Sequence, residues 1–586
     1  MMAGPRDKQG EAVPKEPTAR LPRHVASFRD DTFPVSRQPA GVSPTSAPTL
    51  RPYQRETVAA VIEARKQGCR RMLVCLPTGS GKTVVFAHLA GLAHRQVLVL
   101  AHREELLAQA RDKIQKAMGS DSVVAIERGA ERAPADARVL VCSIRSLHEE
   151  RLARVIRGRD LGLVIYDECH HAAAQDNRRV LSQLGAFDPD WQGTLLGFTA
   201  TTARGDGQGL DDVFERIVYS RTLPEMIRDR YLCPLRGFRI STTADLRKLS
   251  SSGLDFREDE LELAIDVEER NALVARSIQE LARDRRTIAF CVTVAHARNL
   301  CKALNHLGVR AGIVYGDMPP ERRAQELADF RAGKTNALTN VAVLTEGFDD
   351  PGVSCIAMAR PTRSAGMYAQ CVGRGTRLHP GKRDCLILDF VDVSRLSLCT
   401  LPSLFGMPYD LNLMGEEGLE ARKNYDRIFF DYPGFELEAG EITLREIQER
   451  AMHFDPLGLE TDGEVRAISG NAWVSLGSRG LALHFEKRPG RICEVLVVAR
   501  GQRGKRWEVS MDGKRVERFS AIEEAVEAVD YEVAKLGPGA SASALASAGW
   551  RRGPAPEDSP SWRGRLPKNH EEALRLAAFR RVVEGS

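Results

Sequence analysis

The sequence predicts an α/β protein in which two parallel-sheet domains in tandem precede a smaller region of mixed α and β structure. Three features predict this fold class. Short apolar runs alternate with amphipathic stretches from Leu50 onward, the polar stretch Thr242 to Glu262 interrupts this pattern, and the pattern changes again after about residue 415. With 586 residues, the chain is also longer than one hydrophobic core usually organises.

The first α/β domain is predicted by five short apolar runs, because buried parallel strands joined by helices produce runs of this kind. They comprise Arg71 to Leu76, Val97 to Ala101, Val139 to Cys142, Leu161 to Tyr166 and Leu195 to Phe198. We expect this domain at residues 49–235. Residues 1–48 are rich in Pro, Ser, Ala and charge, and we expect a disordered tail there.

The second α/β domain follows the polar stretch, which we assign to a linker at residues 236–265. Its apolar runs comprise Thr287 to Cys291, Arg310 to Val314, Ala337 to Val343, Ser354 to Ala359 and Cys385 to Phe390. The resumed alternation predicts a second parallel sheet within residues 266–414.

The C-terminal region, residues 415–586, has a different pattern. Alternating segments at Ile492 to Val498 and Arg506 to Met511 predict strands between Gly-rich turns, and Ile522 to Leu536 predicts a helix. This accessory region is therefore expected to be a smaller mixed α and β unit.

Composition excludes several classes of protein. The chain has 43% hydrophobic and 28% charged residues, and no apolar run approaches the roughly 18 to 20 residues that span a bilayer. The N-terminus lacks the order of a signal peptide, so we expect no membrane association and a cytoplasmic location. The 12 cysteines include no C-x-x-C pair, which argues against a disulfide framework or a zinc ribbon.

A candidate phosphate-binding loop lies at Leu76-Pro-Thr78-Gly79-Ser80-Gly81-Lys82-Thr83, between an apolar strand and an apolar helix. Its glycines let backbone N–H groups turn toward phosphates at a helix N-terminus. Lys82 would reach the β- and γ-phosphates of a nucleotide, and Thr83 would hold Mg²⁺. The strict phosphate-loop pattern has glycine where this chain has Leu76, and a Gly-rich turn without a ligand is the alternative.

A pair of carboxylates follows the strand Leu161 to Tyr166, in the sequence Asp167-Glu168-Cys169-His170. Nucleotide hydrolysis requires one carboxylate to position Mg²⁺ and another to orient and deprotonate water, and Asp167 and Glu168 suit these roles. An acidic helix cap is the alternative for this motif taken alone.

These residues resemble the superfamily-two helicases and translocases, in the DEAH-like branch of restriction-enzyme motor subunits and repair helicases. The resemblance covers residues 50 to 395 and implies two RecA-like domains that hydrolyse ATP. Arg51-Pro-Tyr-Gln54 resembles the opening segment, where Gln54 would help recognise adenine.

Three further segments of the first domain resemble helicase motifs. The segment around His102 and Arg103 resembles motif Ia, and Cys142 to Leu147 resembles motif Ib. Both motifs face nucleic acid in the family, although a solvated strand end also explains His102 and Arg103. Phe198-Thr-Ala-Thr201 resembles motif III, except that Thr202 stands where proline is common.

Two segments of the second domain extend the resemblance. Val343 to Asp349 resembles motif V, in which Asp349 would approach the ATP ribose while Thr345 and Gly347 approach nucleic acid. Gln370 to Arg377 resembles motif VI, with Arg374 and Arg377 three apart on one predicted helical face. This pair would reach across a cleft between the domains and stabilise charge on the transferring phosphoryl group.

The resemblance therefore implies an ATP-dependent helicase or translocase with ATP and Mg²⁺ as ligands. DNA is the preferred nucleic acid, since the restriction and repair branch acts on DNA, and RNA stays open. One alternative is a motor subunit of a restriction or antiviral complex with a nuclease or other protein partner. Another is an RNA helicase, and a third is a scaffold with a degenerate ATPase.

Positive charge is concentrated near the C-terminus. Residues 466–586 contain 21 Lys and Arg against 15 Asp and Glu, a net charge of +6, whereas the whole chain carries +5. Trp507, Trp550 and Trp562 each stand beside arginine, a pairing that suits phosphate contact and base stacking. A small core that holds the tryptophans explains the same residues, so accessory nucleic-acid binding is one of two interpretations.

Overall fold

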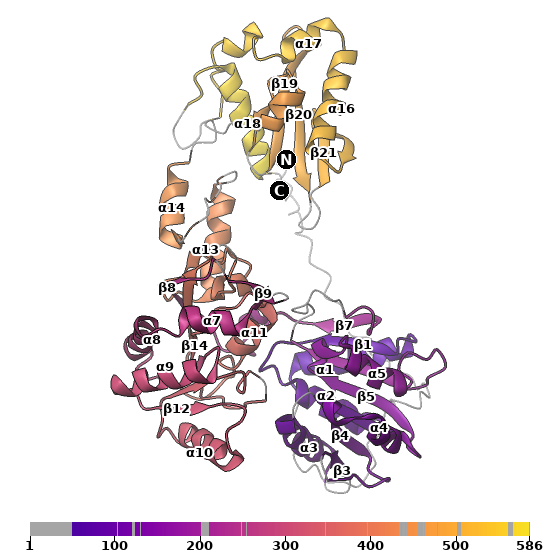
Figure 1. The fold of residues 1–586 in the computed structure, drawn as a ribbon. Coiled ribbons are helices and arrows are strands. Elements are labelled where there is room, and N and C mark those ends of the chain that lie inside the picture. Colours follow the sequence, from indigo (N-terminus) through magenta and orange to yellow (C-terminus); the bar gives the residue numbers. More distant parts are fainter. Residues whose placement is uncertain are drawn as a thin grey trace, which may run out of the picture. The chain divides into compact units, whose positions relative to one another are not determined.

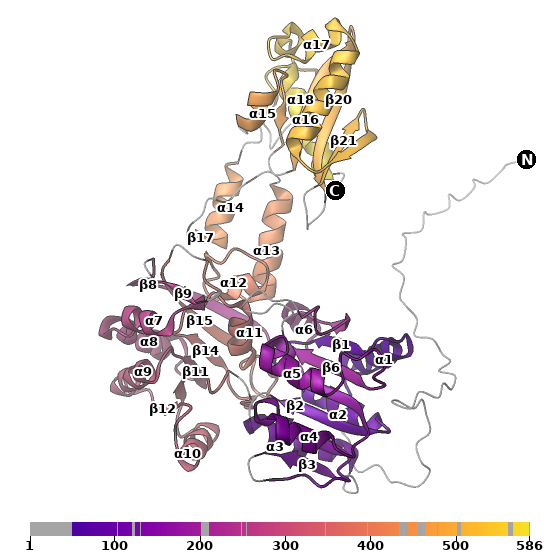
Figure 2. The same cartoon turned by 45° about the vertical axis from the view of Figure 1, so that its right-hand side comes forward.

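The computed structural model describes most of the chain and divides it into two compact units (Figures 1 and 2). Among the described residues, the first unit holds those up to Arg221 apart from Pro77–Ser80, and the second holds Pro77–Ser80 and those from Thr222 onward. The described residues are 50–101, 104–119, 123–128, 131–200, 210–247, 249–252, 255–345, 347–394, 397–432, 435, 437, 440, 442–454, 461, 463–476, 479–500, 506–560 and 566–584.

The first unit is built on a parallel sheet of seven strands in the order β3-β4-β2-β5-β6-β1-β7. The strands are β1 (Arg71–Cys75), β2 (Gln96–Ala101), β3 (Val124–Glu127), β4 (Val139–Ser143), β5 (Leu161–Asp167), β6 (Thr194–Thr199) and β7 (Arg216–Ser220). All five predicted strands are present, within one residue at each end. The central strands have unbroken apolar sequences because they are buried along almost their whole length.

Helices cover both faces of this sheet, as buried parallel strands require. On one face, α4 and α5 pack through Leu152 and Val180 onto strand residues such as Leu98. Elsewhere α2 packs beside α1 and α3. The helices are α1 (Pro52–Lys66), α2 (Lys82–Leu92), α3 (Glu104–Met118), α4 (Glu149–Ile156) and α5 (Gln175–Gln183), with short η1 (Ile144–Ser146) and η2 (Cys169–His171).

The second unit contains a parallel sheet of six strands in the order β12-β13-β11-β14-β15-β8. The strands are β8 (Leu235–Asp245), β11 (Thr287–Phe290), β12 (Ala311–Val314), β13 (Ala337–Asn340), β14 (Cys355–Met358) and β15 (Cys385–Val393). The predicted parallel sheet is confirmed. The strand near Ala337 ends at Asn340, three residues earlier than expected, and β15 continues three residues beyond Phe390.

Residues 236–265, which the sequence assigns to a linker, contribute to this second sheet. Strand β8 is an edge strand paired in parallel with β15, and the hairpin β9 (Ser251–Ser252) and β10 (Asp255–Phe256) and helix α7 (Glu258–Ile265) follow it. An edge strand is half exposed and carries polar side chains, so its sequence lacks the apolar run that marks the central strands.

Helices also cover the second sheet. Val274 of α8 and Leu300 of α9 pack on the face of the sheet that includes Leu388. Since successive strand residues alternate between faces, Asp389 points to the opposite face, toward α11. The helices of this part are α6 (Leu223–Arg228), α8 (Glu268–Leu281), α9 (Val294–His306), α10 (Pro320–Arg331) and α11 (Ala365–Gly373).

The C-terminal region contains an antiparallel sheet in the order β18-β19-β20-β21-β22. Helices α16 and α17 pack with one core cluster of this sheet, and Phe579 of α18 packs with another. The strands are β18 (Val474–Ser475), β19 (Gly480–Arg488), β20 (Arg491–Arg500), β21 (Arg506–Met511) and β22 (Lys514–Phe519). The predicted mixed α and β structure is confirmed.

The remaining elements complete the second unit. They are α12 (Leu401–Leu404), β16 (Leu411–Asn412), α13 (Gly418–Asp431), β17 (Ile442–Thr443), α14 (Leu444–Met452), α15 (Gly463–Ile468), α16 (Ile522–Lys535), α17 (Pro538–Ala544), η4 (Gly549–Arg552) and α18 (His570–Glu584). Within the described ranges, none of the helices combines the length and the apolar stretch that crossing a bilayer requires. All 12 cysteines are free thiols, and nine of them are buried.

Candidate active site

The order of strands in the first unit places the candidate phosphate loop and the acidic pair on either side of one strand. β6 lies between β1, which leads into the loop, and β5, which ends in Asp167. The register pairs Cys75 of β1 with Thr199 of β6, and Asp167 of β5 with Phe198 of β6. Because parallel strands end at a common edge, the motifs predicted at these three strand ends lie side by side.

The loop after β1 turns sharply into α2. Gly79 has φ of 86° and Gly81 has φ of 81°, a left-handed conformation that glycine adopts without steric cost. Gly81 is the N-cap of α2 and has no side chain to cover the first turn, so the N–H groups there can face an anion. Lys82 and Thr83 begin the helix, as the motif predicts.

Lys82 lies directly beside the acidic pair. Its Nζ is 3.4 Å from Oε1 of Glu168, and the side chains of both residues are only 9% exposed. Lys82 Nζ also donates to the carbonyl oxygen of Leu76, at 3.4 Å. The structure therefore brings together the cation of the loop and the predicted water-activating carboxylate, which stand 86 residues apart in the sequence.

Glu168 has an unusual backbone conformation. Its φ of 51° lies in the left-handed region, which non-glycine residues rarely occupy, and its N–H donates to Oδ1 of Asp167 at 3.1 Å. Such outliers cluster at functional sites. His170 Nδ1 lies 3.5 Å from Oε2 of Glu168. We did not predict a role for His170, although its place two residues after Glu168 in the same motif is a usable signal.

Gln54 lies against the phosphate loop. A Cβ atom placed on Gly81 would be 2.9 Å from Nε2 of Gln54, so the side-chain amide of Gln54 lies next to the loop. Gln54 is buried at the start of α1, and its Oε1 accepts a hydrogen bond from the N–H of Arg51 at 2.9 Å. This position beside the loop is compatible with the predicted contact to adenine.

Two cysteines close to these motifs have packing roles. Burial raises the pKa of the Cys75 thiol to about 11 and that of Cys169 well above its ordinary value. Both thiols are therefore protonated near neutral pH and are poor nucleophiles. They fill space beneath the loop and the acidic pair, within the core cluster that also contains Tyr166.

Some motif residues lie outside the described part of the chain. They include the predicted nucleic-acid contacts His102 and Arg103 of motif Ia, Thr201 at the end of motif III and the following residue Thr202. Thr199, at the start of motif III, is fully buried, and its carbonyl oxygen accepts a hydrogen bond from the N–H of Leu76 at 2.9 Å. Motif III is thus joined by its backbone to the residue that opens the phosphate loop.

Motifs V and VI contact each other within the second unit. Arg377 Nε is 3.0 Å from Oδ1 of Asp349, and Arg374 Nη1 donates to the carbonyl oxygen of Phe348 at 3.0 Å. Thr345 Oγ1 donates to the carbonyl oxygen of Ala342 at 2.6 Å. Gly347 has φ of 75°, which explains glycine there. The structure therefore pairs Asp349 with the second arginine of motif VI.

The prediction that both arginines lie on one helical face is wrong. Helix α11 ends at Gly373, Arg374 is its C-cap, and Arg377 lies beyond it. The final turns tighten, with the N–H groups of Arg374 and Gly375 bonded to carbonyls three residues earlier. The two glycines near this point weaken the helix. Both arginines nevertheless reach the adjacent residues Phe348 and Asp349.

Helix α11 is anchored to the sheet by a buried hydrogen bond. Tyr368 Oη donates to Oδ1 of Asp389 at 2.7 Å, and Oδ2 of Asp389 accepts the N–H of Leu401 at 2.8 Å. Burial raises the pKa of Asp389 to about 6 despite these two bonds. This carboxyl group, next to the motif VI helix, should therefore make stability depend on pH.

Asp389→Asn is expected to change that dependence. The pKa is about 4 in the unfolded chain and about 6 in the folded one, so only the folded state retains the proton between these values. This group contributes its full stabilisation below pH 4. As the pH rises through 6 the contribution is lost, and the free energy of unfolding falls by about 3 kcal/mol. The opening free energy of β15, from hydrogen exchange corrected for intrinsic rates, should therefore fall more in wild type than in Asp389→Asn. Parallel pH profiles for the two proteins would contradict this assignment.

Two tryptophans of the C-terminal region have structural roles. Trp550 Nε1 donates to the carbonyl oxygen of Ser543 at 3.0 Å, and Trp507 packs against the core cluster of the antiparallel sheet. Arg551 is 1% exposed and donates to the carbonyl oxygens of His484 and Leu545. These contacts favour the small-core interpretation for both tryptophans. Trp562 and residues 501–505 lie outside the described part of the chain.

Comparisons with known proteins agree with this geometry. A family model described as "Type III restriction enzyme, res subunit" matches residues 47–204, and "Helicase conserved C-terminal domain" matches residues 269–379. The first match contains the phosphate loop and the acidic pair, and the second contains motifs V and VI.

Individual proteins are similar over longer stretches. The putative mitochondrial ATP-dependent helicase irc3 of Schizosaccharomyces pombe is 34% identical over 448 residues, which cover 74% of this chain and 72% of that protein. The putative ATP-dependent helicase IRC3 of Saccharomyces cerevisiae is 32% identical over 62% of this chain and 55% of its own length. The type I restriction enzyme EcoAI endonuclease subunit of Escherichia coli is 25% identical over 64% of this chain and 49% of its own length.

Proposed function

Because the chain belongs to the ATP-dependent superfamily-two helicases, in the family that includes irc3 of Schizosaccharomyces pombe, we propose that it is a DNA helicase or translocase. The observation that carries this proposal is the pairing of Lys82 with Glu168 at 3.4 Å, where the phosphate loop meets the acidic pair. The fold alone would support many functions, whereas this pairing supports nucleotide hydrolysis.

ATP would bind through the phosphate loop. The backbone of Thr78, Gly79, Ser80 and Gly81 would surround the phosphates, and the Lys82 ammonium would contact the β- and γ-phosphates. The left-handed glycines and the uncapped first turn of α2 support this role. Gln54 beside Gly81 would contact the adenine, and Asp349 the ribose, as the family resemblance implies.

Hydrolysis would use the acidic pair. Asp167 and the Thr83 hydroxyl are hard oxygen ligands at the loop, and they would hold Mg²⁺, which supplies charge neutralisation to the phosphates when bound. Glu168 would orient the attacking water and accept its proton. The 3.4 Å contact between Lys82 and Glu168 supports placing the γ-phosphate, which Lys82 would bind, next to the water that Glu168 would orient.

The second unit would supply charge to the transition state. Arg374 and Arg377 would stabilise the oxygens of the transferring phosphoryl group, which is the role of arginine fingers in nucleotide hydrolases. Arg374 contacts Phe348 and Arg377 contacts the adjacent Asp349, which supports a concerted role for the two arginines. His102, Arg103, Thr345 and Gly347 would contact the nucleic-acid strand.

A second candidate function is a motor subunit of a restriction complex. The match of residues 47–204 to the res-subunit family and the similarity to the EcoAI subunit favour it. Such a subunit would need a separate nuclease or other protein partner and would move on duplex DNA without separating its strands. A cytoplasmic location stays a prediction from the sequence, and the relative from S. pombe is named as mitochondrial.

Strand displacement by the purified full-length chain tests the proposal and its alternatives. Labelled partial duplexes of DNA and of RNA, and a DNA duplex that carries a third strand, are incubated with ATP or without nucleotide. We expect ATP-dependent release from partial DNA duplexes. Release of the third strand alone would favour a duplex translocase, and release from RNA alone would establish an RNA helicase. No ATP-dependent release from any substrate would argue against a motor that works without partners.

A further inference from the structure

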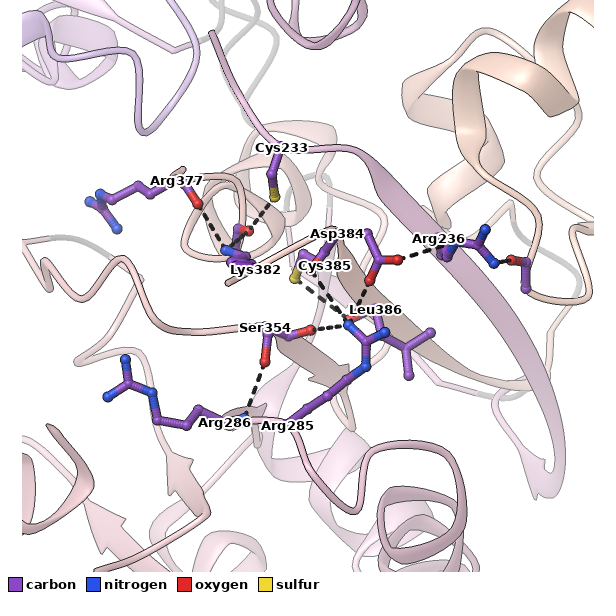
Figure 3. A network of polar contacts seen from close by, with 12 residues as sticks. Cys233, Arg236, Arg285, Arg286, Ser354, Arg377, Lys382, Asp384, Cys385 and Leu386 are labelled. Carbon is purple, nitrogen blue, oxygen red and sulfur yellow. Dashed lines mark hydrogen bonds and ion pairs between the residues drawn. The ribbon is translucent and has the colours of Figure 1, made fainter. Parts of the chain in front are cut away.

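Gly375, Thr376 and Arg377, which follow the C-cap of helix α11, are held by their carbonyl oxygens. Figure 3 shows Lys382 and Cys233 near Arg377. Lys382 Nζ donates to the carbonyl of Gly375 at 2.6 Å and to that of Arg377 at 3.0 Å. The backbone N–H of Cys233 donates to the carbonyl of Thr376 at 2.8 Å, and its thiol to that of Gly375 at 3.2 Å. The backbone that carries Arg377 is therefore fixed at every residue from Gly375 to Arg377.

Lys382 also reaches the segment that follows motif V. Its Nζ is 3.5 Å from the carbonyl oxygen of Pro351, a weak contact that completes the three donors of an ammonium group. The adjacent residue Asp350 is held by Arg286 Nη2 at 2.8 Å. The four successive residues from Phe348 to Pro351, at the end of motif V and just after it, are thus each contacted by a different cation.

Arg377 is the residue that depends most on this arrangement. Lys382 bonds its carbonyl oxygen, whereas its guanidinium pairs with Asp349 through Nε at 3.0 Å. An arginine side chain has four rotatable bonds, so its tip is placed accurately only if its backbone is fixed at one end. Misplacement of a catalytic group by about 1 Å can reduce the rate about 100-fold.

We infer that Lys382 is a positioning residue for ATP hydrolysis, which holds the backbone of Arg377 so that its guanidinium meets the γ-phosphate in the transition state. This inference rests on the proposed function of Arg377. Lys382 itself contacts main-chain oxygens and acts through the arginine. Only a donor that reaches Gly375 and Arg377 together can replace it, and an apolar side chain of similar length cannot.

A purely structural role predicts a different outcome. Basic side chains often bond the last carbonyls of a helix and stabilise it, and loss of such a contact lowers stability without selecting one step of catalysis. A positioning role instead lowers kcat and the affinity for a transition-state analogue together, and it leaves ground-state nucleotide binding almost unchanged.

The test compares Lys382→Met and Lys382→Arg in the full-length chain. Lys334→Met is the matched control, because Lys334 is an exposed lysine of the same sheet domain that pairs with Asp329. For each protein we would measure kcat and KM for ATP with saturating nucleic acid. Dissociation constants for ADP with aluminium fluoride and for a non-hydrolysable ATP analogue, and the melting temperature, complete the comparison.

We expect Lys382→Met to lower kcat about 10- to 100-fold and to weaken the aluminium fluoride complex by a similar factor. KM and analogue affinity should stay within about threefold, Lys382→Arg should recover most of the rate, and Lys334→Met should match wild type. If Lys382→Met does not fold, Lys382→Gln is measured in its place.

Two results separate this inference from the function on which it rests. The positioning role of Lys382 is overturned if Lys382→Met has a wild-type kcat, or if it binds the aluminium fluoride complex and the ATP analogue equally weakly. In that case a low kcat of Arg377→Ala still supports the proposed role of Arg377. A wild-type kcat in Arg377→Ala overturns the proposed role of Arg377, and the positioning role of Lys382 with it.

Discussion

Arg374→Ala is expected to reduce kcat for ATP hydrolysis by about 10³- to 10⁵-fold, because an arginine finger contributes in this range to phosphoryl transfer. Arg374 caps α11, is 4% exposed, and donates to the carbonyl oxygen of Phe348, so its guanidinium is fixed beside motif V. Nucleotide binding should be largely retained, since the phosphate loop and Lys82 remain. Steady-state hydrolysis and fluorescent nucleotide binding measure the two quantities.

The matched control for this prediction is Arg322→Ala, an exposed arginine on α10 in the same sheet domain. It should hydrolyse ATP at the wild-type rate. If Arg374→Ala lost nucleotide binding but kept full turnover of the ATP that it binds, the assignment of Arg374 to the transition state would be contradicted.

Glu168→Gln is expected to reduce kcat about 10²- to 10⁴-fold. The amide keeps the shape of the side chain but cannot accept the proton of the attacking water. The affinity for ATP should be equal or higher. The carboxylate 3.4 Å from Lys82 is removed, so the ammonium group no longer pairs with a negative charge and attracts the phosphates more strongly. Single-turnover hydrolysis separates the chemical step from binding.

Glu150→Gln serves as the control for this substitution, because Glu150 is an exposed acid on α4 of the same unit. Each variant has one negative charge fewer than wild type, so a general electrostatic effect would lower both rates equally. A Glu168→Gln rate within twofold of wild type would assign the proton acceptor to another group.

The sequence predicted where the phosphate loop and the acidic pair lie, because both motifs follow buried strands. Apolar runs identify the buried strands β1 and β5, and residues that follow such strands meet at one edge of a parallel sheet. The sequence therefore predicts that Lys82 and Glu168 lie close together, and the structure places their charged groups 3.4 Å apart.

Other parts of the site could not be predicted because they depend on local termination or on packing. Helix α11 ends at Gly373, just before Arg374, and periodicity does not locate a helix end that depends on glycines such as Gly373 and Gly375. No sequence motif marks Lys382, because its partners are main-chain oxygens, which every residue has. Similarly, the packing of Trp507 and the hydrogen bond of Trp550 favour a small core over a stacking surface, and neither contact is visible in the sequence.

The central claim is that this chain hydrolyses ATP at the Lys82 and Glu168 site in response to nucleic acid. The most direct measurement is the rate of ATP hydrolysis by wild type and by Lys82→Ala, with and without single-stranded and duplex DNA. The account predicts that DNA raises the wild-type rate and that the Lys82→Ala rate stays at background in every condition. A DNA-stimulated rate that is equal in both proteins would contradict it.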